Sequence, residues 1–336
     1  MVHTYPGKED FHLFEDVLTF VYNPQELSLK PNETIDTDNC KACFVLLQHG
    51  KPIARAAVYH NAAISYQDKL TMMIGHYECA DDGEASAQLL QYVVAYAREL
   101  HAHWLIGPMN GSTWNQYRFS ADAHRPTFFQ EPYHPACYLS QWERNGFGVI
   151  AKYYSSYTDC LSIPADRVSQ WQQHFSEQHL TIRSIDINRY QQEMEHIYPF
   201  LVSAFRSNFL YAGISKEKFI ARYLPLQQYL NPELILIAED ETGSVVGVYF
   251  CIDDFNDSNR KSLIIKTVAR KEGEQYRGLG QVMSKIIYDR ALALGYSRII
   301  HAFMIENATS AKSAERFLGI PFRHYYLYGM SLHPLA

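Results

Sequence analysis

The sequence predicts a mixed α/β fold (α+β, with parallel and antiparallel strands in one sheet) that is built twice, in tandem. The chain has 336 residues, about twice the ~150 residues of an average domain. Its second half has the order hairpin, strand, helix, strand, helix, strand, and its first half repeats that order in a different sequence. With 47% hydrophobic residues, each half can bury a core without disulfide bonds.

In the second half, apolar spacing and turn residues define the elements. A helix is predicted from Leu279 because apolar residues recur at helical spacing up to Leu294, and Gly295 suits the left-handed position after a helix. The predicted strands are residues 180–186, 234–238, 245–252, 263–268, 298–305 and 323–330, and the predicted helices are 188–209, 216–229, 279–294 and 307–317.

The first half gives the same order with one long insertion. The predicted strands are residues 43–47, 53–60, 70–77, 103–106 and 149–159, and the predicted helices are 84–100 and 135–144. Residues 107–135 form the insertion, whose many aromatic residues indicate an ordered loop, a possible wall of a substrate pocket. We therefore expect an N-terminal domain at 1–163, a polar helical connection at 164–179 and a C-terminal domain at 180–336.

Composition excludes several classes of protein. The net charge of −6 argues against nucleic acid or an anionic membrane as a partner. No segment has the length of apolar sequence that crosses a bilayer, and the start of the chain lacks a signal peptide, so we expect a cytoplasmic protein with reduced cysteines. No metal site is expected, because the pairs Cys40/Cys43 and His76/Cys79 do not make four convergent ligands and the second pair would point to opposite faces of a strand.

The strongest chemical signal is the loop Gln275-Tyr276-Arg277-Gly278-Leu279-Gly280, between a strand and a helix. Its glycines let a ligand approach backbone N–H groups at a helix N-terminus, and the arginine adds a positive charge, so a phosphate or diphosphate is the expected ligand. A P-loop would continue with Lys-Ser/Thr, and a dinucleotide fingerprint would need a small residue at Met283. Neither of these fits.

What remains resembles the diphosphate loop of the GNAT superfamily of N-acetyltransferases, Gln/Arg-x-x-Gly-x-Gly/Ala, which Gln275, Gly278 and Gly280 match. The resemblance is close over residues 180–336, and over the first half it is weaker and similar to tandem members. It implies a bound acetyl-CoA, with an Asn at the start of the next helix contacting its pantetheine arm. The implied cofactor residues are Thr267, Val268, Ala269, Gln275, Tyr276, Arg277, Gly278, Leu279, Gly280, Gln281, Asn307 and Ser310.

The first copy has acidic residues at the equivalent place. Asp81, Asp82 and Glu84 would neutralise the helix dipole and repel a diphosphate. We therefore expect only the C-terminal copy to bind the cofactor, while the N-terminal copy supports the fold and shapes the substrate site.

The resemblance also implies direct transfer of an acetyl group to the primary amine of a small molecule or peptide, in a cleft lined by the 107–135 insertion and the last strand. A backbone N–H near Val268 would polarise the thioester carbonyl. The sequence leaves the general base open, and the candidates are Glu239, His301 and Glu306. Many members carry a tyrosine as general acid where this chain has Ala314. The candidate substitutes are Tyr325, Tyr326 and Tyr328 on the last strand and Ser310 and Ser313 on the helix before it, and of these Tyr326 is favoured. The alternative function is a non-catalytic acyl-CoA-binding sensor or partner module.

Overall fold

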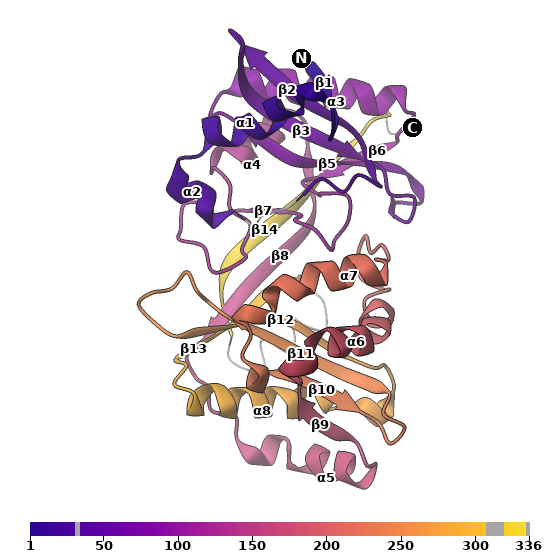
Figure 1. The fold of residues 1–336 in the computed structure, drawn as a ribbon, viewed down its shortest axis with the longest axis vertical. Coiled ribbons are helices and arrows are strands. Elements are labelled where there is room, and N and C mark those ends of the chain that lie inside the picture. The colour runs from indigo at the N-terminus through magenta and orange to yellow at the C-terminus, as the bar shows by residue number, and fades with distance from the viewer. Residues whose placement is uncertain (31–33, 307–318, 334–336) are drawn as a thin grey trace. The chain divides into compact units, whose positions relative to one another are not determined.

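The structure, a computed structural model, describes residues 1–30, 34–306 and 319–333 and divides into two compact units (Figure 1). Unit 1 comprises Met1–Tyr153, Phe209–Ala212 and Arg323–Ala336, and unit 2 comprises Tyr154–Asn208 and Gly213–Phe322. Two long strands, β8 (Gly148–Thr158) and β14 (Ile320–Ser331), run from one unit into the other. The units therefore differ from a division of the sequence at 163–180, because strand pairing assigns most of the last strand to unit 1.

Unit 1 contains a mixed sheet with the strand order β1-β2-β3-β5-β6-β14. Its first strands pair antiparallel, whereas β5 and β6 pair parallel on either side of a helix crossover. The strands and helices that begin in this unit, apart from β8, are β1 (Val2–Thr4), β2 (Cys40–Gln48), β3 (Lys51–Tyr59), β4 (Ser65–Tyr66), β5 (Lys69–Cys79), β6 (Trp104–Gly107), β7 (Phe119–Ser120), α1 (His12–Val21), α2 (Pro24–Leu29), α3 (Gly83–Glu99) and α4 (Cys137–Arg144).

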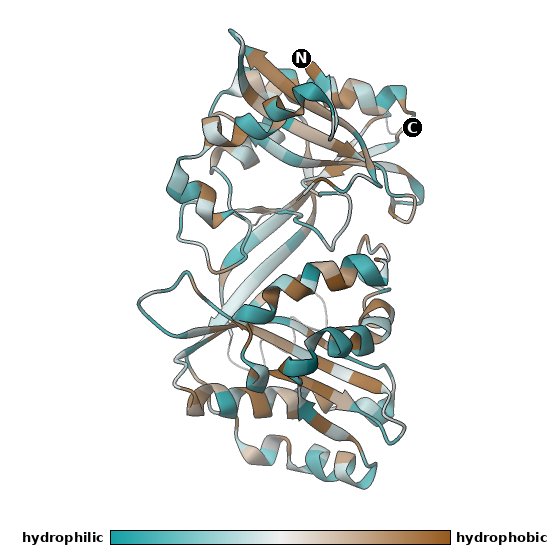
Figure 2. Ribbon diagram, viewed as in Figure 1, coloured by the Kyte–Doolittle hydropathy of each residue, from teal (hydrophilic) through white to brown (hydrophobic). Residues whose placement is uncertain are grey.

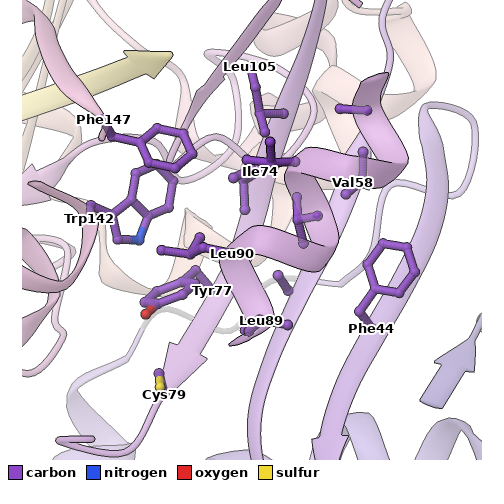
Figure 3. Close-up of a cluster of buried hydrophobic side chains, with 14 of the residues drawn as sticks. Phe44, Val58, Ile74, Tyr77, Cys79, Leu89, Leu90, Leu105, Trp142 and Phe147 are labelled. Atoms are coloured by element: carbon purple, nitrogen blue, oxygen red, sulfur yellow. The ribbon is translucent and has the colours of Figure 1, made fainter. Parts of the chain in front are cut away.

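The core of unit 1 lies between its sheet and α3. Figure 3 shows Leu89 and Leu90 of α3 beside strand residues such as Ile74, with Trp142 and Phe147 closing one side. The Trp142 and Phe147 ring centroids are 4.6 Å apart. Apolar residues at helical spacing on α3 and at alternate positions on the strands supply this buried layer, as their patterns predict.

Unit 2 repeats this design with the strand order β13-β12-β11-β10-β9, in which β12 and β13 pair parallel and the others antiparallel. Its strands and helices are β9 (Thr181–Ser184), β10 (Ile235–Glu239), β11 (Val245–Asp253), β12 (Ser262–Arg270), β13 (Arg298–Ile305), α5 (Ser169–Glu177), α6 (Tyr190–Ala204), α7 (Lys216–Tyr223) and α8 (Leu279–Ala293).

Helices cover both faces of the unit 2 sheet (Figure 1). Tyr249 and Cys251 of β11 point into the core under α8, whereas Phe250, on the other face, contacts Tyr223 of α7 with ring centroids 5.8 Å apart. In Figure 2 the paired strands carry much of the hydrophobic sequence and the connecting loops are mostly hydrophilic. This two-sided burial holds the loop before α8 at one end of a rigid sheet.

The structure confirms the predicted α/β class and most of the predicted elements. The 164–179 connection contains α5, as its polar helical pattern indicated, and the 107–135 insertion buries Phe119 and Phe128. Helices α1 and α2 were not predicted from the sequence. They precede β2 along the chain, in the same way that α6 and α7 precede β10. The predicted helix 307–317 lies outside the described residues.

Within the described ranges, no helix combines the length and the apolar character that a membrane span requires.

A buried ion-pair network supports unit 1 at the end of β5. Glu78 lies 2.7 Å from Lys30 Nζ and accepts hydrogen bonds from the Tyr22 and Tyr138 hydroxyls at 2.5 and 2.9 Å. Arg55, also buried, is 3.9 Å away. Burial raises the pKa of the Glu78 carboxyl, but Lys30 and Arg55 outweigh it and hold that pKa below its usual range.

We predict that Glu78→Gln lowers the free energy of unfolding by about 3 kcal/mol or more, because buried Arg55 loses its counter-charge. Denaturant titration measures this change, and Glu84→Gln, at an exposed position in the first turn of α3, is the matched control with a loss of less than about 0.5 kcal/mol. Equal, small losses in both variants would contradict the structural role of the network.

Candidate functional site

The loop before α8 presents backbone N–H groups without acceptors. Gly278 is the N-terminal cap residue, in the left-handed conformation with φ +89°, and no side chain caps the helix. Its carbonyl accepts hydrogen bonds from the Gln281 and Val282 amides at 2.9 and 3.1 Å. The Leu279 and Gly280 amides donate to no acceptor in the parts of the chain that the structure describes. These two donors and the helix dipole favour an anion at this point.

The two glycines of the motif have different surroundings. A Cβ atom at Gly280 would meet nothing within 4 Å, so this side of the first helical turn is open. A Cβ atom at Gly278 would lie within 2.7 Å of three atoms of the Trp171 indole, which packs directly on the loop backbone. Gly278 is thus required by its positive φ and by this packing, whereas neither reason applies to Gly280.

The side chains of the loop alternate between the core and the surface. Tyr276 and Leu279 are buried and anchor the loop, while Gln275 and Arg277 are exposed. Arg277 Nη1 lies 3.4 Å from Glu274, and both side chains are mostly in water. Such a pair holds the arginine only weakly, so its charge is available to an anionic ligand.

Strand β12 separates from β13 just before this loop. Parallel pairing runs from Ser262 opposite Arg298 to Ile265 opposite His301 and stops there. At the same point the pairing with β11 shifts by one residue, which makes Lys266 a bulge. The three implied cofactor residues beyond the bulge are Thr267, Val268 and Ala269. Of these, Ala269 is buried and Val268 is 49% exposed, so the strand remains accessible where it leaves its partner.

Strands β5 and β6 of the first copy also stop pairing part-way along, but there the 107–135 insertion fills the space beside β5. Parallel pairing of β5 with β6 ends at Met73 opposite Ile106, and one extra residue lies between Gly75 and Glu78. There the His76 amide donates to Asn110 Oδ1 at 2.8 Å. A Cβ atom at Gly75 would lie 2.5 Å from the same oxygen. The insertion therefore fills the gap beside β5.

The helix start in the first copy is capped as well. Asp82 accepts hydrogen bonds from the Glu84 and Ala85 amides at 2.8 and 3.1 Å. The acidic residues expected to repel a diphosphate thus include one that satisfies the first amides of α3 itself.

Glu239, a candidate base, is held in an ion-pair network. It accepts two hydrogen bonds from Arg183, at 2.9 and 2.8 Å, and lies 2.9 Å from His196 Nε2. Arg183 also bonds both oxygens of Glu193. Hydrogen bonds from Arg183 lower the pKa of Glu239 below its usual range, which weakens it as a proton acceptor. Arg183, Glu193 and His196 line an open hollow of about 530 Å³ at the β9 edge of the sheet.

His301, a second candidate, is buried under α8. Its Nε2 lies 2.8 Å from the Tyr288 hydroxyl, and burial lowers its pKa to about 4. The ring is therefore neutral at pH 7 and shares a hydrogen bond with the buried Tyr288 hydroxyl.

Of the other candidates, Glu306 follows a strand and Tyr326 lies in the middle of one. Glu306 is exposed directly after β13. Tyr326 belongs to unit 1, where it packs against the core and its ring centroid is 6.4 Å from that of Tyr328. Tyr325 points to the other face and donates to Glu131 at 2.7 Å, as strand alternation predicts. Asn307 and Ser310 lie outside the described residues.

Two residues that contact the loop before α8 and the bulge of β5 were not predicted from the sequence. Trp171 is a single tryptophan in a polar segment, and Asn110 lies in a glycine-containing insertion. Neither has a periodic pattern that could reveal its long-range contact.

We predict that His301→Gln reduces the loss of stability on acidification. The unfolded chain takes up a proton at His301 near pH 6.5, whereas the folded chain does so only near pH 4, so this residue lowers the free energy of unfolding as the pH falls between these values. Glutamine can still accept from Tyr288 but cannot be protonated. Between pH 7 and 5, the decrease measured by denaturant titration should be about 2 kcal/mol smaller in the variant, and an unchanged decrease would contradict the buried neutral state.

Comparison with known proteins agrees with this geometry at the level of the fold. No family model matches the sequence, and no curated protein matches it. Among solved structures, it is similar to a GCN5-related N-acetyltransferase from Anabaena variabilis, with a TM-score of 0.56, 10% identity and coverage of 99% of this chain and 73% of that one. A conserved protein of unknown function from Enterococcus faecalis, described as a probable N-acyltransferase, has a TM-score of 0.54, 8% identity and coverage of 99% and 72%.

A third similar structure is a GCN5-related glucosamine N-acetyltransferase region in a fungal multi-domain GH3 beta-N-acetylglucosaminidase. Its TM-score is 0.52 at 12% identity, with 98% of this chain covered. This chain spans only 38% of that longer protein. At these identities the similarity is one of fold, and it extends over both units. The chain therefore has the fold of the GCN5-related N-acetyltransferases.

Proposed function

We propose that the protein is an acetyl-CoA-dependent N-acyltransferase that moves an acetyl group to a primary amine of a small molecule or peptide. The observation that carries this proposal is a combination in unit 2. Two amides at the start of α8 have no acceptor among the described residues, and strand β12 leaves its partner β13 just before them. An anion at the amides and an extended arm along β12 would belong to one elongated ligand.

Each part of this site has a proposed task. The Leu279 and Gly280 amides, with Arg277, bind the diphosphate. Thr267, Val268 and Ala269 lie along the pantetheine arm, and a backbone N–H near Val268 polarises the acyl carbonyl. When bound, acetyl-CoA would supply the acetyl group as a thioester. The amine would attack this carbonyl directly, without a covalent enzyme intermediate; the carbon–sulfur bond would break, and the proton lost by the amine would end on the released coenzyme A thiol.

The first copy supports the assignment by contrast. Asn110 occupies the gap beside β5, and Asp82 caps α3. Both features that would receive a ligand in unit 2 are thus satisfied within unit 1, and we propose that unit 1 binds no acyl-CoA.

Among the candidate bases, the contacts favour Glu306. It is exposed at the end of β13, beyond the point where β13 leaves β12. Glu239 is neutralised by Arg183, and His301 is enclosed by the core. The proposed roles of Asn307 and Ser310 in holding the pantetheine arm rest on the sequence resemblance. That of Tyr326 as general acid rests on its place on the last strand, since the position of the usual tyrosine is Ala314.

The second function is a non-catalytic acyl-CoA-binding module. It is favoured by one sequence feature, Ala314 at the position where similar enzymes carry their acidic tyrosine. Both functions require binding of coenzyme A, and only turnover separates them.

We predict that Gly280→Glu weakens coenzyme A binding at least tenfold more than Gly280→Gln does, because the two side chains add the same bulk and differ in charge. Both side chains enter open space, so both variants should fold, and only the glutamate adds a negative charge beside the diphosphate. A repulsion of about 1.4 kcal/mol corresponds to this tenfold change. Titration calorimetry measures the dissociation constants, and equal affinities in the two variants would place the diphosphate elsewhere.

We further predict release of coenzyme A from acetyl-CoA in the presence of primary amines, with kcat lowered about 100-fold by Glu306→Gln. Binding of coenzyme A should be unchanged, because the carboxylate acts on the amine. Glu239→Gln is the matched control and should retain kcat. A loss confined to Glu239→Gln would reverse the assignment, and absence of turnover with a broad amine panel would favour the binding module.

A further inference from the structure

The helix of the connection, α5, is packed onto the cofactor loop rather than standing apart as a linker. Val168 and Phe175 are buried in the same core as the inner face of α8. Between them in the sequence, Trp171 is only partly buried at the edge of this core. Its backbone amide donates to the Val168 carbonyl at 3.0 Å, in the first turn of the helix. The side chain is thus fixed at its base and reaches the surface at its tip.

The indole lies against the backbone of Gly278. The three atoms that a Cβ at Gly278 would meet, within 2.7 Å, are Cγ, Cδ2 and Cε2. All three belong to the five-membered ring, which also contains Nε1. Among the residues that the structure describes, this N–H has no acceptor. It is therefore available to a ligand bound at the start of α8.

We propose that Trp171 is a wall of the ligand site, which contacts the diphosphate-bearing nucleotide end of coenzyme A and donates its indole N–H to it. The inference rests on the proposed function, and it adds a residue from outside the cofactor loop. A ligand held by the amides directly after Gly278 would lie close to the ring that covers Gly278. Helix α5 then contributes to ligand binding in addition to linking the two halves of the chain.

Trp171 is also a natural reporter of binding. The chain has four tryptophans, and the other three, Trp104, Trp114 and Trp142, lie in unit 1. Comparison of the wild type with Trp171→Phe therefore assigns an emission change caused by a ligand at the start of α8 to Trp171.

The test is a titration with coenzyme A, followed by tryptophan fluorescence and by calorimetry, on the wild type, Trp171→Phe and Trp104→Phe. Adenosine 3′,5′-bisphosphate and pantetheine are titrated separately. We expect the wild type and Trp104→Phe to change emission with coenzyme A and with the nucleotide fragment, but not with pantetheine. Trp171→Phe keeps an aromatic ring on Gly278 and should lose the emission change, with its dissociation constant raised about three- to tenfold through the lost hydrogen bond.

The outcomes separate this inference from the proposed function. Binding of coenzyme A with unchanged wild-type emission and an unchanged dissociation constant in Trp171→Phe would overturn the role of Trp171 and leave the proposed function intact. Absence of any calorimetric heat with coenzyme A would overturn both. The melting temperature of Trp171→Phe shows whether α5 is still packed, and the wild-type emission gives a result that does not depend on that variant.

Discussion

The site depends on one constraint, that backbone hydrogen-bonding groups need partners. Within unit 2, β13 pairs with β12 as far as Ile265, β11 pairs with β12 as far as Arg270, and α8 satisfies its own amides from Gln281 onward. Between Ile265 and α8, the described part of β13 adds no further pairing to the chain. The buried residues Tyr276 and Leu279 hold it in place there, so the open amides are presented by a rigid framework and no ordering is needed before a ligand binds.

The same constraint explains why the two copies differ although their architecture is the same. In unit 1 the bulged strand and the start of α3 also have backbone amides that need acceptors. The Asn110 side chain accepts a hydrogen bond from the His76 amide, and the Asp82 carboxylate accepts one from the first turn of α3. A polar side chain in these places does what a ligand would do. The divergence between the copies is therefore local, since it needs only an insertion after β6 and one acidic cap, and the sheets on which both rest are unchanged.

Periodicity in the sequence predicts most of this framework. Apolar spacing located α3 and α8 within a residue or two, and the strand 298–305 agrees with β13 in full. It did not locate α1 and α2, which are only 10 and 6 residues long, and α1 packs against a sheet formed later in the chain. Nor could it assign β14 to unit 1, because pairing between Tyr328 and Gly107 joins residues more than two hundred positions apart. The candidate bases show the same limit, since only the three-dimensional contacts reveal that Arg183 neutralises Glu239 and that Tyr288 engages His301.

The two glycines of the loop differ in how strongly their match to the motif indicates a ligand site. Gly278 would be needed here even without a ligand, because its φ is positive and the Trp171 ring leaves no room for a side chain. Its agreement with the motif is thus explained by folding alone. Gly280 has an ordinary backbone and open space beside it, and a glycine in the first turn of a helix lowers stability by about 1 kcal/mol relative to alanine. A residue that costs stability and fills no packing need is better explained by close approach of something outside the chain. Gly280 and the amides beside it are therefore the part of the motif that indicates a ligand site.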